Sequence, residues 1–318
     1  MKISIITPSR NHGDALEATI RSVMNQSLSE VEHIVVDAAS TDNTLEVLAR
    51  YPHVRYISER DNGFEEAFNK GLDMATGTYV ACCNIWDEYI DPNWLQDATG
   101  VMDSQPDVSM VSGRFVELDA LNHEVRTAPY DWFVTEAPQK EAGLYYYLFN
   151  PWPAIAEVAL VAPKETFLRC FPRRRVVIED RDVWFDFLNT FYASGHLAVF
   201  LPRTAISTRS HDDSRILNQL ESGIFRRIAR SYTKHQRRLR YGLLFGRQKM
   251  IFRDRGGNPL PVKFRFWRFW YAFLDFKIRM FWFKKIMKGK AGWKHPDVNP
   301  RMISASLRRA GLMKPGGG

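Results

Sequence analysis

Four clusters of polar residues in this sequence have the types and spacing needed for ligand binding or proton transfer. In the first, Asp37 directly follows the apolar run HIVV, where a carboxylate could accept hydrogen bonds from a ribose hydroxyl or a base N–H. Asp37, Ser40 and Asp42 could equally cap a following helix. The residues alone leave these two interpretations even.

The second cluster, NIWDE at residues 84–88, follows the apolar run TYVACC. Its carboxylates could hold a divalent cation, because hard oxygen ligands suit Mg²⁺ or Mn²⁺. Acidic residues also favour the N-terminus of a helix, where they interact with the helix dipole. Taken alone, this cluster fits the helix terminus better than the cation.

The third and fourth clusters lie further along the chain. EDRD at residues 179–182 follows a short apolar run and precedes an apolar helix, so it could cap that helix or supply a general base. RSHDDS at residues 209–214 places His211 among Asp and Ser in a polar loop. A histidine in such surroundings is a better ligand candidate than an isolated one.

The elements that must position these clusters alternate between strands and helices. Strands separated by helices of about 10–15 residues indicate parallel βαβ units, in which ligands bind where the strands end. The pattern predicts strands at residues 3–6, 33–36, 54–57 and 78–83 and helices at 15–25, 44–51 and 64–75. Beyond residue 106 the alternation weakens, and we expect strands at 108–112, 113–118, 156–162 and 196–201 and helices at 164–170 and 182–194.

Charge divides the chain into two unlike regions. The 318 residues are 45% hydrophobic and 25% charged, which excludes a disordered chain. The net charge of +8 combines residues 1–202, with 16 Lys and Arg against 30 Asp and Glu, and residues 203–318, with 28 against 6. We therefore expect two regions with different electrostatic roles.

Three cysteines, Cys82, Cys83 and Cys170, are too few for a disulfide framework, and this suits a reducing, cytosolic setting. The start, MKISIITPSR, lacks the long apolar core of a signal peptide and is expected to be a strand. We also expect no ordinary membrane-spanning helix, because no run of about 18 uncharged apolar residues occurs.

The order of these clusters along a βαβ chain resembles the family-two glycosyltransferases of the GT-A fold, specifically bacterial members that build cell-surface polysaccharide. The resemblance implies an α/β fold with a Rossmann-like, mostly parallel sheet flanked by helices. It covers roughly residues 1–215 and is carried by the segments SIITPSRN, HIVVDAASTDNT, SERDNGFEEAFNKG, ATGTYVACCNIWDEY, VIEDRDVW and TRSHDDS.

The resemblance implies a role for each matching position. The nucleotide-sugar would contact residues after the first three strands and on the helix behind them: Pro8, Arg10, Asp37, Glu59, Asp61, Gly63, Asn69 and Lys70. The family's metal-binding acidic motif falls on residues 84–87, so Asp87 keeps its last carboxylate. Trp86 stands where another carboxylate is expected, which is a departure from the family.

The resemblance also implies the catalytic group. The family's base is the Asp of a Glu-Asp pair, which here is Asp180 with Glu179 beside it, and the family's late histidine, a metal or diphosphate contact, falls on His211. Such a base increases the nucleophilicity of an acceptor hydroxyl, while a cation stabilises the departing nucleoside diphosphate. A single displacement would invert the anomeric configuration.

The basic C-terminal region has three interpretations. Residues 262–288 contain 11 aromatic residues among 27, interleaved with Lys and Arg, and this composition suits the headgroup region of a membrane. The alternative is a helix packed on the catalytic domain. Nucleic-acid binding ranks below both, because no nucleic-acid module is recognisable and the acidic clusters would have no role.

We thus expect a GT-A catalytic domain at residues 1–215 and a basic, aromatic, helical region at 216–318. The predicted protein is an inverting glycosyltransferase at the cytoplasmic face of the plasma membrane, bound peripherally to anionic lipid. It would use Mg²⁺ or Mn²⁺ and move a sugar from a nucleotide-sugar donor, expected to be a UDP-sugar, to a lipid-linked or glycan acceptor, without nucleic acid. The alternative is a catalytically silent sugar-nucleotide or glycan binding protein, because Trp86 replaces a carboxylate.

Overall fold

A computed structural model describes residues 2–119, 122–128, 159–173, 183–209 and 251–260. Its first half alternates strands and helices in the order β1 (Ile3–Ser9), α1 (Gly13–Met24), β2 (Val31–Asp37), α2 (Thr44–Ala49), β3 (Arg55–Ser58), α3 (Phe64–Met74) and β4 (Tyr79–Cys82). The second half contains β5 (Asp87–Tyr89), α4 (Trp94–Ser104), β6 (Val108–Leu118), β7 (Glu124–Ala128), β8 (Leu160–Pro163), α6 (Lys164–Cys170), α7 (Val183–Ala193) and β9 (Leu197–Arg209).

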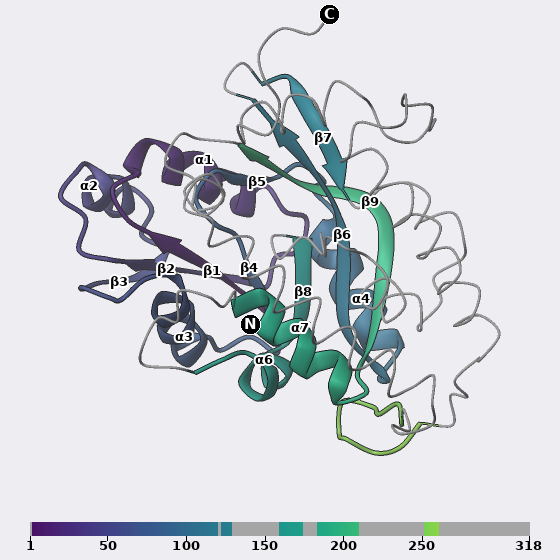
Figure 1. The fold of residues 1–318 in the computed structure, drawn as a ribbon. Helices are drawn as coiled ribbons and strands as arrows, with labels where there is room; N and C mark the ends of the chain where they lie inside the picture. Colours follow the sequence, from purple (N-terminus) through teal and green to yellow (C-terminus); the bar gives the residue numbers. More distant parts are fainter. Residues whose placement is uncertain (1, 120–121, 129–158, 174–182, 210–250, 261–318) are drawn as a thin grey trace, which may run out of the picture.

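The described strands form one sheet in the order β3-β2-β1-β4-β8-β6-β9-β5, with β7 paired to β6 (Figure 1). In its first half, β1 runs parallel to both β2 and β4, and β2 runs parallel to β3. This confirms the predicted βαβ units. The carboxyl ends of these strands therefore share one edge of the sheet, where the sequence places its first two polar clusters.

The second half of the sheet is mixed. β8 is antiparallel to both β4 and β6, whereas β6 and β9 are parallel. The prediction of separate strands at 108–112 and 113–118 was wrong, because β6 continues through Gly113 with a register shift there. A Cβ on Gly113 would lie 2.6 Å from the Trp94 ring, so this glycine allows the close approach of α4 and does not form a turn.

Helices cover both faces of the sheet (Figure 1). Alternate strand residues point to opposite sides, so Ile6 packs with α3, α6 and α7, while Ile5 packs with α4. Leu16 of α1 and Val47 of α2 pack with Val35 of β2. In the described part of the chain, no helix is long and apolar enough to cross a membrane.

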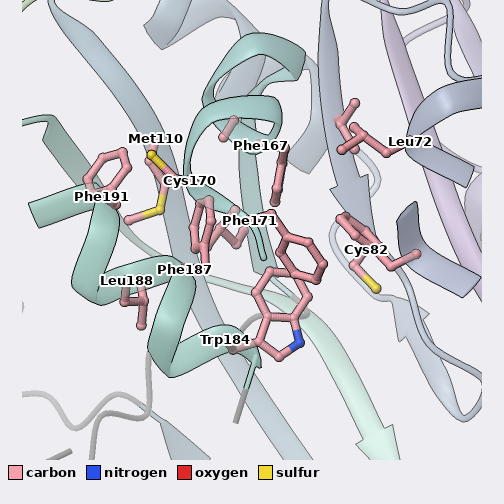
Figure 2. Close-up of a cluster of buried hydrophobic side chains, with 14 of the residues drawn as sticks. Leu72, Cys82, Met110, Phe167, Cys170, Phe171, Trp184, Phe187, Leu188 and Phe191 are labelled. Carbon is pink, nitrogen blue, oxygen red and sulfur yellow. The ribbon is translucent and has the colours of Figure 1, made fainter. Parts of the chain in front are cut away.

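A dense aromatic cluster joins α3, α6 and α7 on one face of the sheet (Figure 2). The ring of Phe68 lies 5.4 Å from Phe167, 4.7 Å from Phe171 and 5.6 Å from Trp184, measured between ring centroids. Cys82 and Cys170 are buried in the same core, and all three cysteines are free thiols. This cluster holds α7 against the helix that follows the β3 strand end.

Residues 251–260, which the sequence assigns to the basic C-terminal region, pack on the domain formed by the sheet and its helices. Phe252 is 1% exposed and belongs to the same core as α7. The chain turns back on itself here, because Gly257 N donates to Asp254 O at 3.0 Å and Arg253 pairs with Pro259. The rest of the C-terminal region lies outside the described residues.

Candidate donor site at the sheet edge

The site begins where β1, β2 and β3 end. Ser9 of β1 and Ser58 of β3 lie in register with Asp37 of β2, one on each side. Three parallel strands therefore deliver polar residues to one point of the sheet edge. Pro8 is half-buried beside this point and Arg10 is exposed just beyond it.

Asp37 is the centre of this edge. Its side chain is fully buried, and Oδ2 accepts hydrogen bonds from Ser40 N at 3.0 Å and from Ser58 Oγ at 2.6 Å. The Ser40 hydroxyl also donates to Oδ1, and Glu59 N donates to the Asp37 carbonyl at 2.9 Å. The carboxylate thus fixes the loops that follow β2 and β3 at this edge of the sheet.

Of Asp37, Ser40 and Asp42, the three candidates for capping the next helix, Asp42 takes that role. Asp42 Oδ1 accepts from Thr44 N, the first residue of α2, at 3.1 Å, and its Oδ2 accepts from Gly13 N of α1 at 3.0 Å. One carboxylate therefore serves the N-termini of two neighbouring helices, and these hydrogen bonds lower the pKa of Asp42 although its partial burial opposes them.

Two loops of the edge are joined by side-chain hydrogen bonds. Asn11 N donates to Ser40 Oγ at 2.8 Å, and Thr41 N donates to Asn11 Oδ1 at 2.8 Å. Asn11 and Ala39 both have a φ of 53°, the left-handed conformation that side chains rarely adopt. Backbone strain of this kind concentrates at binding sites. The sequence did not single out Asn11 or Ser58, although both lie at or just beyond strand ends.

The stretch after β3 makes a turn into α3. Asp61 Oδ1 accepts from Gly63 N at 2.8 Å, and Gly63 has a φ of 111° immediately before the helix. Among the described residues, and apart from Gly63 and its two chain neighbours, no heavy atom lies within 4 Å of the position that a Gly63 Cβ would occupy, so the space above this residue is open. The turn therefore leaves room for a ligand between β3 and α3.

Lys70 and Asn69 are on α3, but the structure engages both in contacts within the protein. Lys70 Nζ lies 2.8 Å from Glu59 Oε1 and 3.2 Å from Glu66 Oε1. Burial opposes its charge, but these carboxylates raise the pKa of Lys70 above its usual value. Asn69 Nδ2 donates to Pro172 O at 3.0 Å, away from the loop after β3. Contact with a donor remains a prediction for both residues.

The second cluster follows β4 and folds into β5. Asp87 is 2% exposed, and its Oδ2 accepts from Asn84 N at 3.0 Å. Burial raises the pKa of Asp87 to about 7, although hydrogen bonds from Thr208 and Asn84 oppose that shift. Trp86 has a φ of 76° and is half-buried, with its ring 6.0 Å from that of His12.

β9 brings a third segment to this cluster. Asp87 pairs with Thr208, Arg209 N donates to Trp86 O at 3.1 Å, and Arg209 Nη2 lies 3.1 Å from Glu88 Oε1. In the sequence, His211 follows the Asp87 partner Thr208 by three positions. His211, Asp180 and Glu179 themselves lie outside the described residues.

The chemistry of the second cluster fits a cation only in part. Asp87 supplies a carboxylate at a strand end, as a hard cation requires, but Trp86 supplies an indole where a ligand is expected. Within the described ranges, no three His, Cys, Asp or Glu side chains form a group that could hold a metal ion. Further ligands could come from residues outside the described ranges, such as His211, or from the donor.

Comparison with known proteins identifies the family of this domain. Residues 4–153 match the family model described as glycosyl transferase family 2. These residues belong to that family. The match covers every described element of the sheet edge from β1 to β5, so the sequence-based resemblance is confirmed.

Curated relatives of this family 2 domain share its N-terminal part. TuaG of Bacillus subtilis, a putative teichuronic acid biosynthesis glycosyltransferase, is 41% identical over 101 residues, which are 30% of this chain and 38% of TuaG. The uncharacterised glycosyltransferase YibD of Escherichia coli is 36% identical over 91 residues, 27% of this chain and 26% of YibD. These matches span well under half of each relative's length.

A solved structure shares the fold of this family 2 domain. Residues 1–349 of TarS from S. aureus, crystallised in complex with UDP-GlcNAc, align with a TM-score of 0.56 and 18% identity. The alignment covers 72% of this chain and 65% of that one. The predicted GT-A fold class is therefore confirmed, with a curled sheet whose first half is parallel and helices on both faces.

Proposed function

We propose that this chain is an inverting glycosyltransferase that transfers a sugar from a nucleotide-sugar donor to a lipid-linked or glycan acceptor of cell-surface polysaccharide. The observation that carries the proposal is the convergence of three parallel strand ends on Asp37, within residues that match family 2. A UDP-sugar is the proposed donor, and the complex of TarS with UDP-GlcNAc supports this choice.

The residues divide between two tasks. The loops held by Asp37 and the open turn at Gly63 would bind the nucleotide, with Pro8, Arg10 and Asp61 beside them. Asp180, next to Glu179, would take the proton from the acceptor hydroxyl as it attacks the anomeric carbon, and the nucleoside diphosphate would leave from the opposite side. The bond to the acceptor oxygen forms as the bond to the diphosphate breaks, so the anomeric configuration inverts.

A divalent cation is a separate part of the proposal. Asp87 and His211, with oxygens of the donor diphosphate, would hold Mg²⁺ or Mn²⁺. When bound, the cation would supply charge stabilisation for the departing diphosphate.

A donor panel tests the transferase proposal. Full-length protein is incubated with sugars linked to UDP, GDP and other nucleoside diphosphates in Mg²⁺, Mn²⁺ or EDTA, and both UDP binding and transfer are measured. Transfer with inverted product configuration by NMR supports the proposal, and Asp180→Asn should abolish transfer while leaving UDP affinity intact. Failure to bind or turn over any donor would refute it.

The second candidate is a catalytically silent sugar-nucleotide or glycan binder. Trp86 at the expected carboxylate position and the burial of Asp87 favour it. Binding of UDP by the wild type without measurable transfer, in any cation, would decide for this candidate.

Peripheral attachment to the cytoplasmic face of an anionic membrane completes the proposal, and it rests on the basic, aromatic composition of residues 262–288. The full chain should float with vesicles containing anionic lipid and not with neutral ones. Replacing Lys284, Lys285 and Lys288 by Gln should reduce flotation at low salt. Equal flotation of the variant and the wild type would contradict the attachment site.

A further inference from the structure

The loop between β3 and α3, residues 59–63, belongs to the proposed donor pocket. At its start, Glu59 N donates to the Asp37 carbonyl at 2.9 Å, which extends the pairing of β3 with β2. At its end, Gly63 has a φ of 111° and leads directly into α3. Arg60 and Asn62, between these points, are exposed. The conformation of this stretch therefore depends on its contacts with α3.

Lys70 of α3 is surrounded by three oxygen atoms. Its Nζ lies 2.8 Å from Glu59 Oε1 and 3.2 Å from Glu66 Oε1, and it donates to the Arg60 carbonyl at 3.2 Å. An ammonium group has three N–H donors, so these three oxygens can use all of them. A diphosphate could gain a contact with Lys70 only by displacing one of these partners.

Glu66 connects Lys70 to the far end of the loop. While its Oε1 faces Lys70, its Oε2 accepts from Asn62 N at 3.1 Å and from Asn62 Nδ2 at 2.6 Å. The hydrogen bonds from Asn62, and then the one from Lys70, lower the pKa of Glu66, so its carboxylate is ionised at neutral pH. The loop is thus attached to α3 at Arg60 and at Asn62, on both sides of Asp61.

The charge of this cluster suits a structural contact better than recognition of an anion. Two carboxylates, those of Glu59 and Glu66, face the single ammonium of Lys70, so the cluster is negative as a whole. A nucleoside diphosphate is also negative and would be repelled by the carboxylates. The same charges, paired with each other, restrain the loop before any ligand arrives.

We propose that Lys70 and Glu66 are positioning residues, which hold residues 59–63 in the conformation that binds the nucleoside diphosphate of the donor. The proposal rests on the proposed function, in which this loop lines the donor pocket. It replaces the expected contact between Lys70 and the nucleotide. Because ordering a loop costs free energy, a loop that is fixed before binding gives a higher affinity without any new contact to the ligand.

Two variants of the full-length protein distinguish positioning from direct contact. Lys70→Met should weaken UDP binding in calorimetry at least about 5-fold. Glu66→Ala gives opposite results for the two roles. If Lys70 contacted the diphosphate, removal of the neighbouring carboxylate would free its ammonium and strengthen UDP binding. In the positioning role the loop loses its attachment at Asn62, and UDP binding should weaken at least about 3-fold.

Glu165→Ala is the matched control. Like Glu66, Glu165 lies in the first turn of a helix and pairs with a basic residue four positions on, here Arg169. The control should leave the UDP affinity unchanged. Lys70→Arg, which keeps a cation with several donors, should recover most of the affinity that Lys70→Met loses.

Steady-state kinetics add a second distinction. In Lys70→Met and Glu66→Ala the donor KM should rise while kcat stays within about twofold of the wild type, because the loop acts on donor binding and not on the chemical step. A lower kcat with an unchanged donor KM would contradict the positioning role.

Hydrogen exchange provides a readout that does not depend on a donor. Asn62 N donates to Glu66 and Gly63 N donates to Asp61, so both amides are protected while the loop is held. Relative to the intrinsic rate of each sequence, residues 59–66 should exchange several-fold faster in Lys70→Met and Glu66→Ala than in the wild type and in Glu165→Ala. Equal exchange in all four proteins would show that the cluster does not hold the loop.

The proposed function and the positioning role can be told apart when they fail. A wild type that binds no nucleoside diphosphate refutes the donor pocket, and the positioning role with it. Normal UDP binding by the wild type, combined with unchanged affinity in both α3 variants or with stronger binding in Glu66→Ala, overturns the positioning role alone.

Discussion

Replacing His33 should reduce the acid sensitivity of this fold. His33 lies on β2, is 3% exposed, and its Nε2 is 2.9 Å from the Thr7 hydroxyl on β1. Burial in the sheet lowers its pKa to about 3, and the nearby charge of His53 contributes to the same shift. The ring therefore stays neutral in the folded protein as the pH falls from neutral into the mildly acidic range.

The sign and size of the effect follow from linkage. In the unfolded chain, histidine has a pKa of about 6.5 and gains a proton as the pH falls, whereas folded His33 does not. The unfolded state binds more protons, so stability falls with decreasing pH. Between about pH 7.5 and pH 5 this one side chain should cost about 2 kcal/mol, because its protonation is disfavoured over roughly 1.5 pH units below 6.5.

Urea unfolding at the two pH values measures this difference. His33→Gln keeps a partner for Thr7 and should lose about 2 kcal/mol less unfolding free energy than the wild type between about pH 7.5 and pH 5. A constant packing loss cancels in this comparison. His53→Gln, which removes an exposed histidine, is the control and should behave almost as the wild type. An equal pH dependence of His33→Gln and the wild type would refute the neutral, buried state of His33.

Three further predictions concern other parts of the fold. Gly77→Ala should destabilise the protein by about 1–3 kcal/mol in urea unfolding, because its Cβ would lie 2.6 Å from Ser4 N. Gly100→Ala should stabilise α4 by about 0.5–1 kcal/mol, because the described part of the chain places no neighbouring side chain within 4 Å of its Cβ. Asp37→Ala should weaken UDP binding at least about 10-fold in calorimetry, since the loops after β2 and β3 lose their shared acceptor. Arg255→Met should lower the free energy of unfolding by about 2 kcal/mol, because it leaves main-chain carbonyls without a charged donor. The thermal midpoint should fall by several degrees.

The parallel half of the sheet could be predicted because each strand and helix shows its own periodicity. Strands such as residues 33–36 are apolar on both faces, and helices such as 64–75 repeat apolar residues every three or four positions. Observed boundaries differ by a few residues, as at β2, which runs from Val31 to Asp37. Local periodicity is sufficient to predict strands and helices where neighbouring strands of the sheet are also close together in the sequence.

One element that the sequence missed depends on a distant partner. β5 is three residues long and exists through its pairing with β9. Short segments of this kind gain their structure from tertiary contacts more than from propensity. α4 was also missed, although Trp94, Leu95, Ala98 and Met102 recur at helical spacing, a local signal that a three-residue strand does not have.

For the candidate site, the sequence predicted where polar residues gather but not how each is used. Asp37 and Asp42 are five residues apart in one polar run, and either could cap a helix. The strand register places Asp37 at the sheet edge, beside Ser58 of β3. Asp42 accepts its second hydrogen bond from Gly13 N, at the N-terminus of the neighbouring helix α1. Such partners come from other elements, so no local pattern contains them.

Charge composition divided the chain after residue 202, but packing does not follow that division. Arg255 counts among the basic residues of the C-terminal region, yet its guanidinium donates to the carbonyls of Met102 and Val108, near and beyond the end of α4. A cation there interacts favourably with the helix dipole and with carbonyls that the helix leaves without partners. Part of the C-terminal positive charge is therefore used within the catalytic domain. Because Phe252 is buried in the core, residues 251–260 are held to the domain, and the proposed attraction of the C-terminal region to anionic lipid would have to come from other basic residues.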